Sequence, residues 1–176
     1  MNQIEDKDII DYLRREPNKG FNLFMAKYKE PIYWHIRRLV VSYDDAKDVA
    51  QETFVRIFRN ISQYSADNSF TAWIYRIATN ESLRFLNKNA SQAEALDQAF
   101  NLMSDEYIDY SDLESVKLQK VIHTLPPKQQ AAFNMRYYDE MSFEDIAHSI
   151  DSTPSSAKMN YKLAKDKIIK YIKNYE

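Results

Sequence analysis

The stretch DAKDVAQETFVRIF, residues 45–58, has the apolar period of an α-helix. On a helix of about 3.6 residues per turn, one side carries the residues expected to face the core: Ala46, Ala50, Thr53, Phe54 and Ile57. The opposite side carries Asp48, Gln51, Glu52, Val55 and Arg59. Charged helix faces are usually solvated, so this side is either a solvated surface or a surface that binds a partner. Both interpretations stay open at this point.

The amino-acid composition favours helices. The chain has 176 residues, of which 44% are hydrophobic and 28% charged, so it can bury the core of one domain or of two small ones. Glycine occurs once, at Gly20, and proline five times. This leaves few residues for the positive-φ turns that β-hairpins prefer. We therefore expect an all-α protein.

Composition also excludes several kinds of site. The chain has no cysteine, which rules out disulfides, thiolate zinc sites and cysteine nucleophiles. Its three histidines, His35, His123 and His148, lack the spacing of metal ligands, and one glycine cannot form a glycine-rich phosphate loop. We expect no catalytic residue, no metal and no cofactor. The N-terminus lacks a signal-peptide pattern and no apolar run is long enough to span a bilayer, so we expect a cytoplasmic protein without membrane insertion.

Helical periodicity predicts further helices in the N-terminal half, over residues 4–15, 21–41 and 70–89. We expect Pro31 to kink or restart the second of them. Ser42 and the acidic residues after it are suited to cap the helix of the 45–58 stretch, which should end near Asn60. Residues 61–69 are polar and turn-rich, and they predict a loop.

The middle of the chain predicts a linker. Helical periodicity fades after residue 90, and acidic residues accumulate at Asp97, Asp105, Glu106, Asp109 and Asp112. The segment is longer than an ordinary connection within a compact domain. We therefore expect two small helical domains, at residues 1–90 and 113–176, joined by a flexible acidic linker at 91–112. An irregular acidic lid packed on one domain is the alternative.

The second domain has a helix-turn-helix pattern. After helices at residues 113–124 and from Pro127, a short helix is expected at 143–150, a turn at 151–153 and a longer basic helix at 154–171. Many helical hairpins share this pattern, so DNA binding is one of two interpretations. The last helix is expected to bury one stripe, Ala157, Tyr161, Ala164, Ile168, Tyr171 and Ile172. Its outward lysines are either solvated or neutralise phosphates.

Three motifs identify the family that the chain resembles: DAKDVAQETF at 45–54, FTAWIYRIATN at 70–80 and LPPKQQ at 125–130, ahead of the helix-turn-helix. With these motifs in this order, the chain resembles bacterial sigma factors of the extracytoplasmic-function group, which retain only the second and fourth conserved regions. The match covers roughly residues 21–88 and 125–172. It implies a non-catalytic subunit that binds core RNA polymerase and directs promoter recognition and transcription initiation.

The resemblance implies a role for each surface. The outward side of the 45–58 helix is implied to dock on the clamp helices of the β′ subunit, through Asp48, Gln51, Glu52 and Val55. The 61–69 loop and the flank of the next helix are implied to read the minus-10 element, where a base is flipped from the duplex, through Tyr64, Asn68, Ser69, Arg76, Asn80, Arg84 and Lys88. The helix from Pro154 is implied to read the minus-35 element in a major groove, through Ser155, Ser156, Lys158, Met159, Lys162, Leu163 and Lys165.

The chain departs from the family pattern at several of these positions. Arg84 stands where the family often has an acidic residue, and Asp151 replaces the usual turn glycine. Asn160 and Leu163 stand where arginines are common. Because Met159 and Leu163 can contact thymine methyl groups, we hypothesise a minus-35 specificity unlike that of better-known members.

The implied partners are core RNA polymerase, through the β′ clamp helices and the β flap, promoter DNA and, as is common in the group, an anti-sigma factor. A stand-alone helix-turn-helix regulator with an N-terminal helical sensing domain is the alternative function. The acidic side of the 45–58 helix and the motif at 70–80 count against it, because a free regulator would need neither. An enzyme is disfavoured by the absence of any cluster of catalytic or ligand residues.

Overall fold

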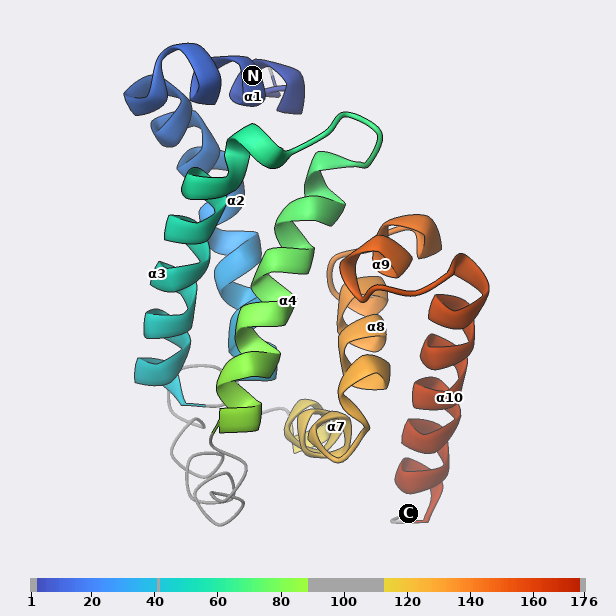
Figure 1. Ribbon diagram of the computed structural model, residues 1–176. Helices are drawn as coiled ribbons and strands as arrows, with labels where there is room; N and C mark the ends of the chain where they lie inside the picture. Colours follow the sequence, from blue (N-terminus) through green and yellow to red (C-terminus); the bar gives the residue numbers. More distant parts are fainter. Residues whose placement is uncertain (1–2, 41, 89–112, 175–176) are drawn as a thin grey trace.

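The structure is a computed structural model that describes residues 3–40, 42–88 and 113–174. Every regular element in these ranges is helical (Figure 1), as predicted. The N-terminal half contains α1 (Asp6–Arg15), α2 (Pro17–Leu39), α3 (Tyr43–Asn60), the 3-10 turn η1 (Ile61–Gln63) and α4 (Phe70–Lys88). The C-terminal half contains α7 (Leu113–His123), α8 (Pro127–Tyr137), α9 (Phe143–Ser149) and α10 (Pro154–Lys173). The predicted linker at 91–112 lies outside the described residues.

The first two helices cross at the single glycine. A Cβ atom on Gly20 would lie 2.3 Å from the backbone nitrogen of Leu13 in α1, so only hydrogen fits between the two backbones. Gly20 is therefore an interior residue of α2 that permits close contact with α1. The long helix begins at Pro17 rather than at Phe21, and it continues through Pro31, so the expected restart at Pro31 is not observed.

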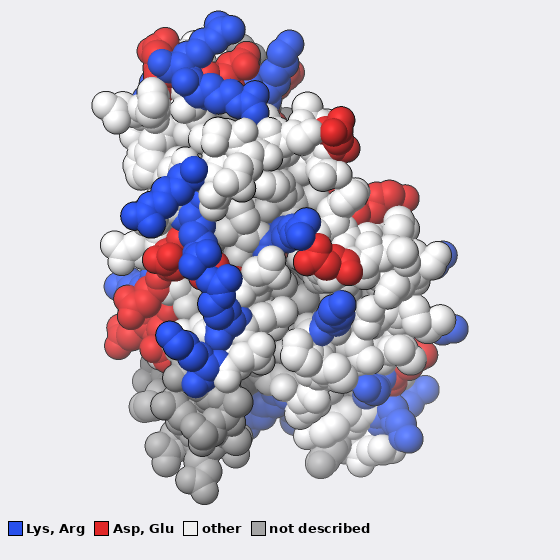
Figure 2. Space-filling view, viewed as in Figure 1, with Lys and Arg blue, Asp and Glu red and all other residues white. Residues whose placement is uncertain are grey.

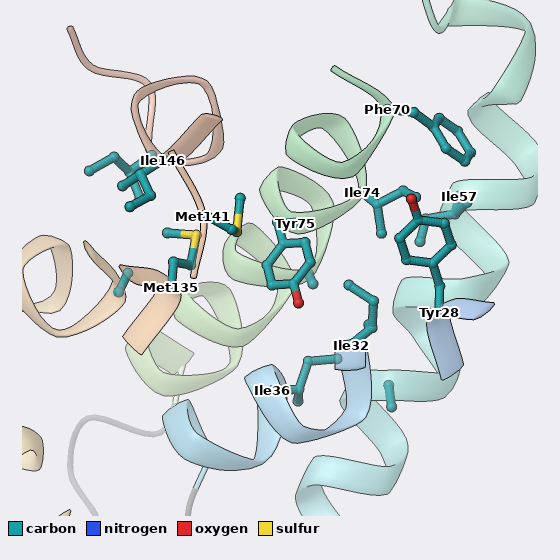
Figure 3. Close-up of a cluster of buried hydrophobic side chains, with 14 of the residues drawn as sticks. Tyr28, Ile32, Ile36, Ile57, Phe70, Ile74, Tyr75, Met135, Met141 and Ile146 are labelled. Atoms are coloured by element: carbon teal, nitrogen blue, oxygen red, sulfur yellow. The ribbon is translucent and has the colours of Figure 1, made fainter. Parts of the chain in front are cut away.

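One apolar cluster joins helices from both halves of the chain. Figure 3 shows side chains of α2, α3 and α4 together with side chains of α8, α9 and the segment between them, namely Tyr28, Ile32, Ile36, Ile57, Phe70, Ile74, Tyr75, Met135, Met141 and Ile146. All of them are buried. Burial of apolar side chains is the main favourable term in folding. The contact between α4 and α9 is therefore part of the core that stabilises this arrangement.

A second, smaller cluster stabilises the C-terminal half. It contains residues of α7, α8, α10 and the turn between α7 and α8, namely Val121, Ile122, Leu125, Phe133, Ala164 and Ile168. The predicted stripe of α10 is confirmed for Ala157, Ala164 and Ile168, and Tyr161 is half-buried, but Tyr171 and Ile172 are 37% and 42% exposed. The prediction that these last two are buried is wrong, because the apolar period of α10 continues for a turn beyond the packed surface.

Helix α4 is buried on two sides. Phe70, Ile74 and Ala78 are buried on one side, and Ala72, Tyr75, Thr79 and Ser82 are buried as well. The second set includes contacts with α9, because the Ser149 hydroxyl donates a hydrogen bond to the carbonyl oxygen of Ala72 at 3.2 Å. No helix in the described ranges is both long enough and apolar enough to cross a membrane.

Candidate nucleic-acid interface

The outer side of α3 presents the residues that were expected to bind a partner. The Ser42 hydroxyl accepts a hydrogen bond from the backbone N–H of Asp45 at 3.4 Å and caps the helix as predicted. Of the five residues predicted for the inner side, Ala46, Ala50, Thr53 and Ile57 are buried and Phe54 is half-buried. Asp48, Gln51 and Glu52 are exposed, and Val55 is half-buried. The periodic pattern therefore placed all four outer residues on one accessible side.

A buried carboxylate links α3 to α4. Glu81 of α4, only 9% exposed, forms ion pairs with Arg56 of α3 at 2.9 Å and with Arg84 at 3.0 Å. Glu52 also contacts Arg56, at 3.2 Å. Both arginines remain substantially exposed, whereas the Glu81 carboxylate is buried, and the two guanidinium groups compensate its charge. Sequence analysis missed Glu81, although its spacing of three residues from Arg84 was a signal for an ion pair on one helix.

Lys and Arg side chains form a column over α3 and α4 (Figure 2). On α4, the exposed residues Arg76, Asn80, Arg84 and Lys88 recur every four positions, so they form one row along the helix. These are four of the seven residues predicted to contact the minus-10 element. The row is basic and continuous over most of the helix length, which suits it to contact a phosphate backbone.

The loop between η1 and α4 is built around Tyr64. Its ring is only 9% exposed and contacts Phe70 and Trp73 at centroid distances of 5.2 and 5.4 Å. Its hydroxyl donates to the carbonyl oxygen of Asn68 at 2.6 Å. Tyr64 therefore supports the loop from inside, whereas Asn68 is exposed. The Ser69 hydroxyl accepts from the backbone N–H of Ala72 at 3.1 Å and caps α4.

The helix-turn-helix has a capped start on each helix. The Ser142 hydroxyl accepts from the N–H of Asp145 at 3.1 Å to start α9, and the Thr153 hydroxyl accepts from the N–H of Ser156 at 3.2 Å to start α10. In the turn between them, Asp151 has a φ of 51°, a conformation that favours glycine. Its carboxylate contacts Arg76 of α4 at 2.7 Å.

The outer side of α10 brings together the residues predicted to contact the minus-35 element. The exposed members are Ser155, Lys158, Met159, Lys162, Leu163 and Lys165. Met159 is 53% exposed and Leu163 is 40% exposed. Ser156 is half-buried, and the Asn160 side-chain amide donates to its carbonyl oxygen at 3.0 Å. The same amide lies 3.5 Å from the Ser156 hydroxyl, so the Ser156 side chain contacts its own helix, whereas the other six residues face solvent.

A polar cluster lies where α2, α4 and the segment after α8 meet. Asp139 accepts a hydrogen bond from the Tyr75 hydroxyl at 3.0 Å and lies 3.5 Å from the Arg38 guanidinium. Burial raises the pKa of Asp139, and Arg38 opposes that shift. His35 is fully buried with its Nε2 atom 2.8 Å from the Thr79 hydroxyl, and burial together with Arg38 lowers its pKa to about 3. The described residues contain no group of three or more potential metal-ligating side chains.

Comparison with known proteins identifies both halves. Residues 24–92 match the family model for Sigma-70 region 2, and residues 115–168 match the model for Sigma-70, region 4. The ECF RNA polymerase sigma-E factor of Haemophilus influenzae is 28% identical over 163 residues, which cover 85% of each chain. The RNA polymerase sigma-H factor of Pseudomonas aeruginosa is 28% identical over 160 residues, covering 84% of this chain and 83% of the relative.

Two solved structures share the fold. CnrH in complex with the cytosolic domain of CnrY has a TM-score of 0.75 at 16% identity, covering 97% of this chain and 99% of that one. The sigma factor RpoE in complex with the anti-sigma factor NepR from Bartonella quintana has a TM-score of 0.69 at 18% identity, covering 88% and 98%.

The two region matches occur in the family's order and contain the three motifs quoted from the sequence. Because both halves match regions of Sigma-70, the comparisons support a sigma factor and not the stand-alone regulator. The chain belongs to the sigma-70 family as an ECF sigma factor, a non-enzymatic protein that directs promoter recognition by RNA polymerase.

Proposed function

We propose that this sigma factor binds its partners through three separate surfaces. The outer side of α3 binds core RNA polymerase, the 61–69 loop with the basic row of α4 reads the minus-10 element, and α10 reads the minus-35 element. Residues 1–90 and 113–176 act as the two functional domains, joined by residues 91–112. The observation that carries this proposal is the exposure of Asp48, Gln51 and Glu52 on one side of α3, opposite its buried side.

For polymerase binding, the exposed acidic side of α3 offers carboxylates to a basic partner surface. Charge complementarity of this kind steers association and fixes orientation. Glu52 is held in part by Arg56 at 3.2 Å, and an exposed pair of this type is worth about 0–1 kcal/mol. It therefore releases easily to a partner. We propose the β′ clamp helices as that partner, the β flap as a further contact and the cytoplasm as the place of action.

For the minus-10 element, the row of Arg76, Asn80, Arg84 and Lys88 supports contact with the backbone of an unpaired strand. Flipping a base from the duplex costs a few kcal/mol, which contacts with the backbone and with the loop must offset. Arg76 is paired with Asp151 in the free chain, with both side chains about half exposed. Such a pair is weak, so DNA phosphates can take the place of Asp151.

For the minus-35 element, α10 combines exposed lysines with Met159 and Leu163. The lysines can neutralise phosphates, and the two apolar side chains suit the methyl groups of thymine in the major groove. Neither DNA-binding surface needs high affinity for DNA by itself. Both are attached to the same polymerase, so once one surface has bound the promoter, binding of the other is effectively intramolecular.

An anti-sigma factor is a further proposed partner. RpoE of Bartonella quintana was solved in complex with the anti-sigma factor NepR, and CnrH with the cytosolic domain of CnrY. The shared fold supports the proposal that a protein inhibitor also binds this chain.

The α3 assignment is tested by reversing charge at Asp48 and Glu52 together. We expect Asp48→Lys/Glu52→Lys to lose at least about a hundredfold in affinity for core polymerase, since each reversal places a cation against a basic surface. Asp11→Lys/Asp166→Lys is the matched control, because it makes the same charge change at exposed positions of α1 and α10. Equal affinity of the two double variants, with both folded by circular dichroism, would refute the assignment.

A further inference from the structure

Helix α1 lies outside the residues that match region 2, yet it packs beside the proposed minus-10 loop. The match begins at residue 24, whereas α1 ends at Arg15. Ile9 and Leu13 are buried, at 0% and 5% exposure, and Gly20 lets α1 approach α2 closely. Figure 1 shows α1 at the end of the bundle where η1 leads into the loop, and α1 and η1 are in contact. Its position is therefore fixed by the core.

The first link between α1 and the loop holds the start of the loop. The Arg14 guanidinium donates a hydrogen bond to the carbonyl oxygen of Tyr64 at 3.0 Å. A charged donor makes a stronger hydrogen bond than a neutral one. Because this carbonyl belongs to the peptide that connects Tyr64 to Ser65, the bond fixes the direction in which the exposed part of the loop leaves the fold.

The second link holds the residues that follow the loop. The carboxylate of Asp6 accepts hydrogen bonds from the Tyr28 hydroxyl at 2.6 Å and from Lys27 Nζ at 2.8 Å. The same Tyr28 hydroxyl lies 3.0 Å from the hydroxyl of Thr71, in the first turn of α4. Asp6 thus reaches the beginning of α4 through Tyr28, and α1 is connected to both ends of the loop.

Between these two ends, residues 65–68 are exposed. Within this tip, the Ser65 hydroxyl donates to the Asp67 carboxylate at 2.8 Å, which shapes the tip but does not orient it relative to the fold. At the far end of the tip, the carbonyl oxygen of Asn68 accepts a hydrogen bond from the Tyr64 hydroxyl at 2.6 Å. The orientation of the tip therefore depends on how Tyr64 and the start of α4 are held. A binding site must be positioned to within about 0.5 Å to discriminate between ligands, so loosening one end should reduce discrimination more than affinity.

We propose that α1 braces the minus-10 loop from both ends, and that Arg14 and Asp6 are positioning residues for base selection at the minus-10 element. This inference rests on the proposed minus-10 role of the loop. It adds an element that lies outside the region 2 match and assigns it a part in promoter specificity. Neither residue needs to contact DNA for this role.

The test compares base selection by holoenzymes reconstituted from core polymerase and full-length chains. Each holoenzyme is incubated with a promoter pool randomised at the minus-10 and minus-35 positions, and the bound DNA is sequenced. Arg14→Met removes the link to Tyr64, and Arg14→Lys keeps a charged donor. Arg15→Met is the matched control, because it removes the same charge from an exposed position in the same turn of α1.

We expect Arg14→Met to reduce the enrichment of the preferred minus-10 sequence between about threefold and tenfold, which is what a charged hydrogen bond at a partly exposed site is worth. Arg14→Lys should restore at least part of it, and Arg15→Met should match the wild type. The minus-35 preference should not change, because α10 is remote from α1 in the fold (Figure 1). Tyr28→Phe, which removes the second link but keeps the ring, should also weaken minus-10 selection.

Three results would overturn the inference. Unchanged minus-10 enrichment in Arg14→Met would show that the link has no role in selection. An equal loss of binding to all sequences would show that Arg14 is a phosphate contact or only stabilises the fold. A wild-type holoenzyme that selects no minus-10 sequence at all, while still selecting at minus-35, would refute the proposed minus-10 function and this inference with it.

Discussion

Replacing His35 by glutamine is expected to remove a large part of the acid sensitivity of this fold. His35 is fully buried between α2 and α4, and the groups facing its ring are Thr79, Tyr75, Arg38 and Asp139. Burial, with Arg38 adding to it, lowers the pKa of His35 from 6.5 to about 3. The folded protein therefore keeps the ring neutral at a pH where the unfolded chain protonates it.

The shifted pKa of His35 makes the free energy of unfolding depend on pH. Because the folded pKa lies below the unfolded one, the contribution of His35 to the free energy of unfolding is complete above pH 6.5 and is lost as the pH falls toward 3. Each pH unit in this window costs about 1.4 kcal/mol, so the loss at pH 5 is about 2 kcal/mol. Asp139 contributes with the opposite sign, because burial raises its pKa, so its stabilising effect is greatest in acid.

Urea unfolding at pH 8 and pH 5, followed by tryptophan fluorescence, measures this difference. His35→Gln can keep a hydrogen bond to Thr79 and should lose about 2 kcal/mol less than the wild type between the two pH values. His148→Gln, at an exposed position of α9, is the control and should behave as the wild type. Some acid sensitivity should remain in every variant, because burial also lowers the pKa of His123, to about 4. Parallel pH dependence in His35→Gln and the wild type would refute the reasoning.

Two further substitutions test the packing of α1 and the specificity of α10. Gly20→Ala should lower the free energy of unfolding by about 1–3 kcal/mol in urea titrations, because its Cβ would meet the Leu13 backbone at 2.3 Å; a stabilised variant would show that the two helices separate without cost. Met159→Ala/Leu163→Ala should change the bases preferred at the minus-35 element in the pool selection, with minus-10 preferences retained. Unchanged minus-35 preferences would count against a role of these side chains in specificity.

Local sequence periodicity predicted which side of each helix is buried, but not always what it packs against. The period of residues 45–58 placed Asp48 and Glu52 outside and Ile57 inside, and the structure confirms this placement. Helix caps could also be predicted, because the Ser42 hydroxyl accepts its hydrogen bond from the N–H of a residue only three positions later. These features depend on neighbours within one or two turns.

The features that were missed depend on contacts distant in sequence. Tyr75 and Asp139 are 64 positions apart and meet at 3.0 Å, and nothing in either local pattern indicates that contact. The second helix was expected to begin only at residue 21, after Gly20, whereas Gly20 lies inside α2 against Leu13. A close crossing of two helices is a property of both helices together, so the sequence around Gly20 does not indicate it. The second buried side of α4 consists largely of small and polar residues, such as Ala72 and Ser82, which do not register as an apolar stripe.

In the candidate site, too, the exposure of residues on one helix could be predicted, whereas contacts between distant parts of the chain could not. The resemblance implied that Arg76, Asn80 and Lys88 lie on the flank of α4, and all three are exposed there. The ion pair between Arg76 and Asp151 and the hydrogen bond between Arg14 and Tyr64 span 75 and 50 positions. Each joins a helix to a loop or turn elsewhere in the chain. Their mutual placement is a tertiary property, so only the folded chain reveals these contacts.

Transcription from a promoter pool by core RNA polymerase, with and without this protein, tests the central claim most directly. We predict that the protein co-elutes with core polymerase and that transcript mapping finds new start sites at a fixed distance from shared minus-10 and minus-35 sequences. Those start sites should disappear with Asp48→Lys/Glu52→Lys. No co-elution and no new start sites with the wild-type protein would contradict the assignment of this chain as a promoter-recognition subunit.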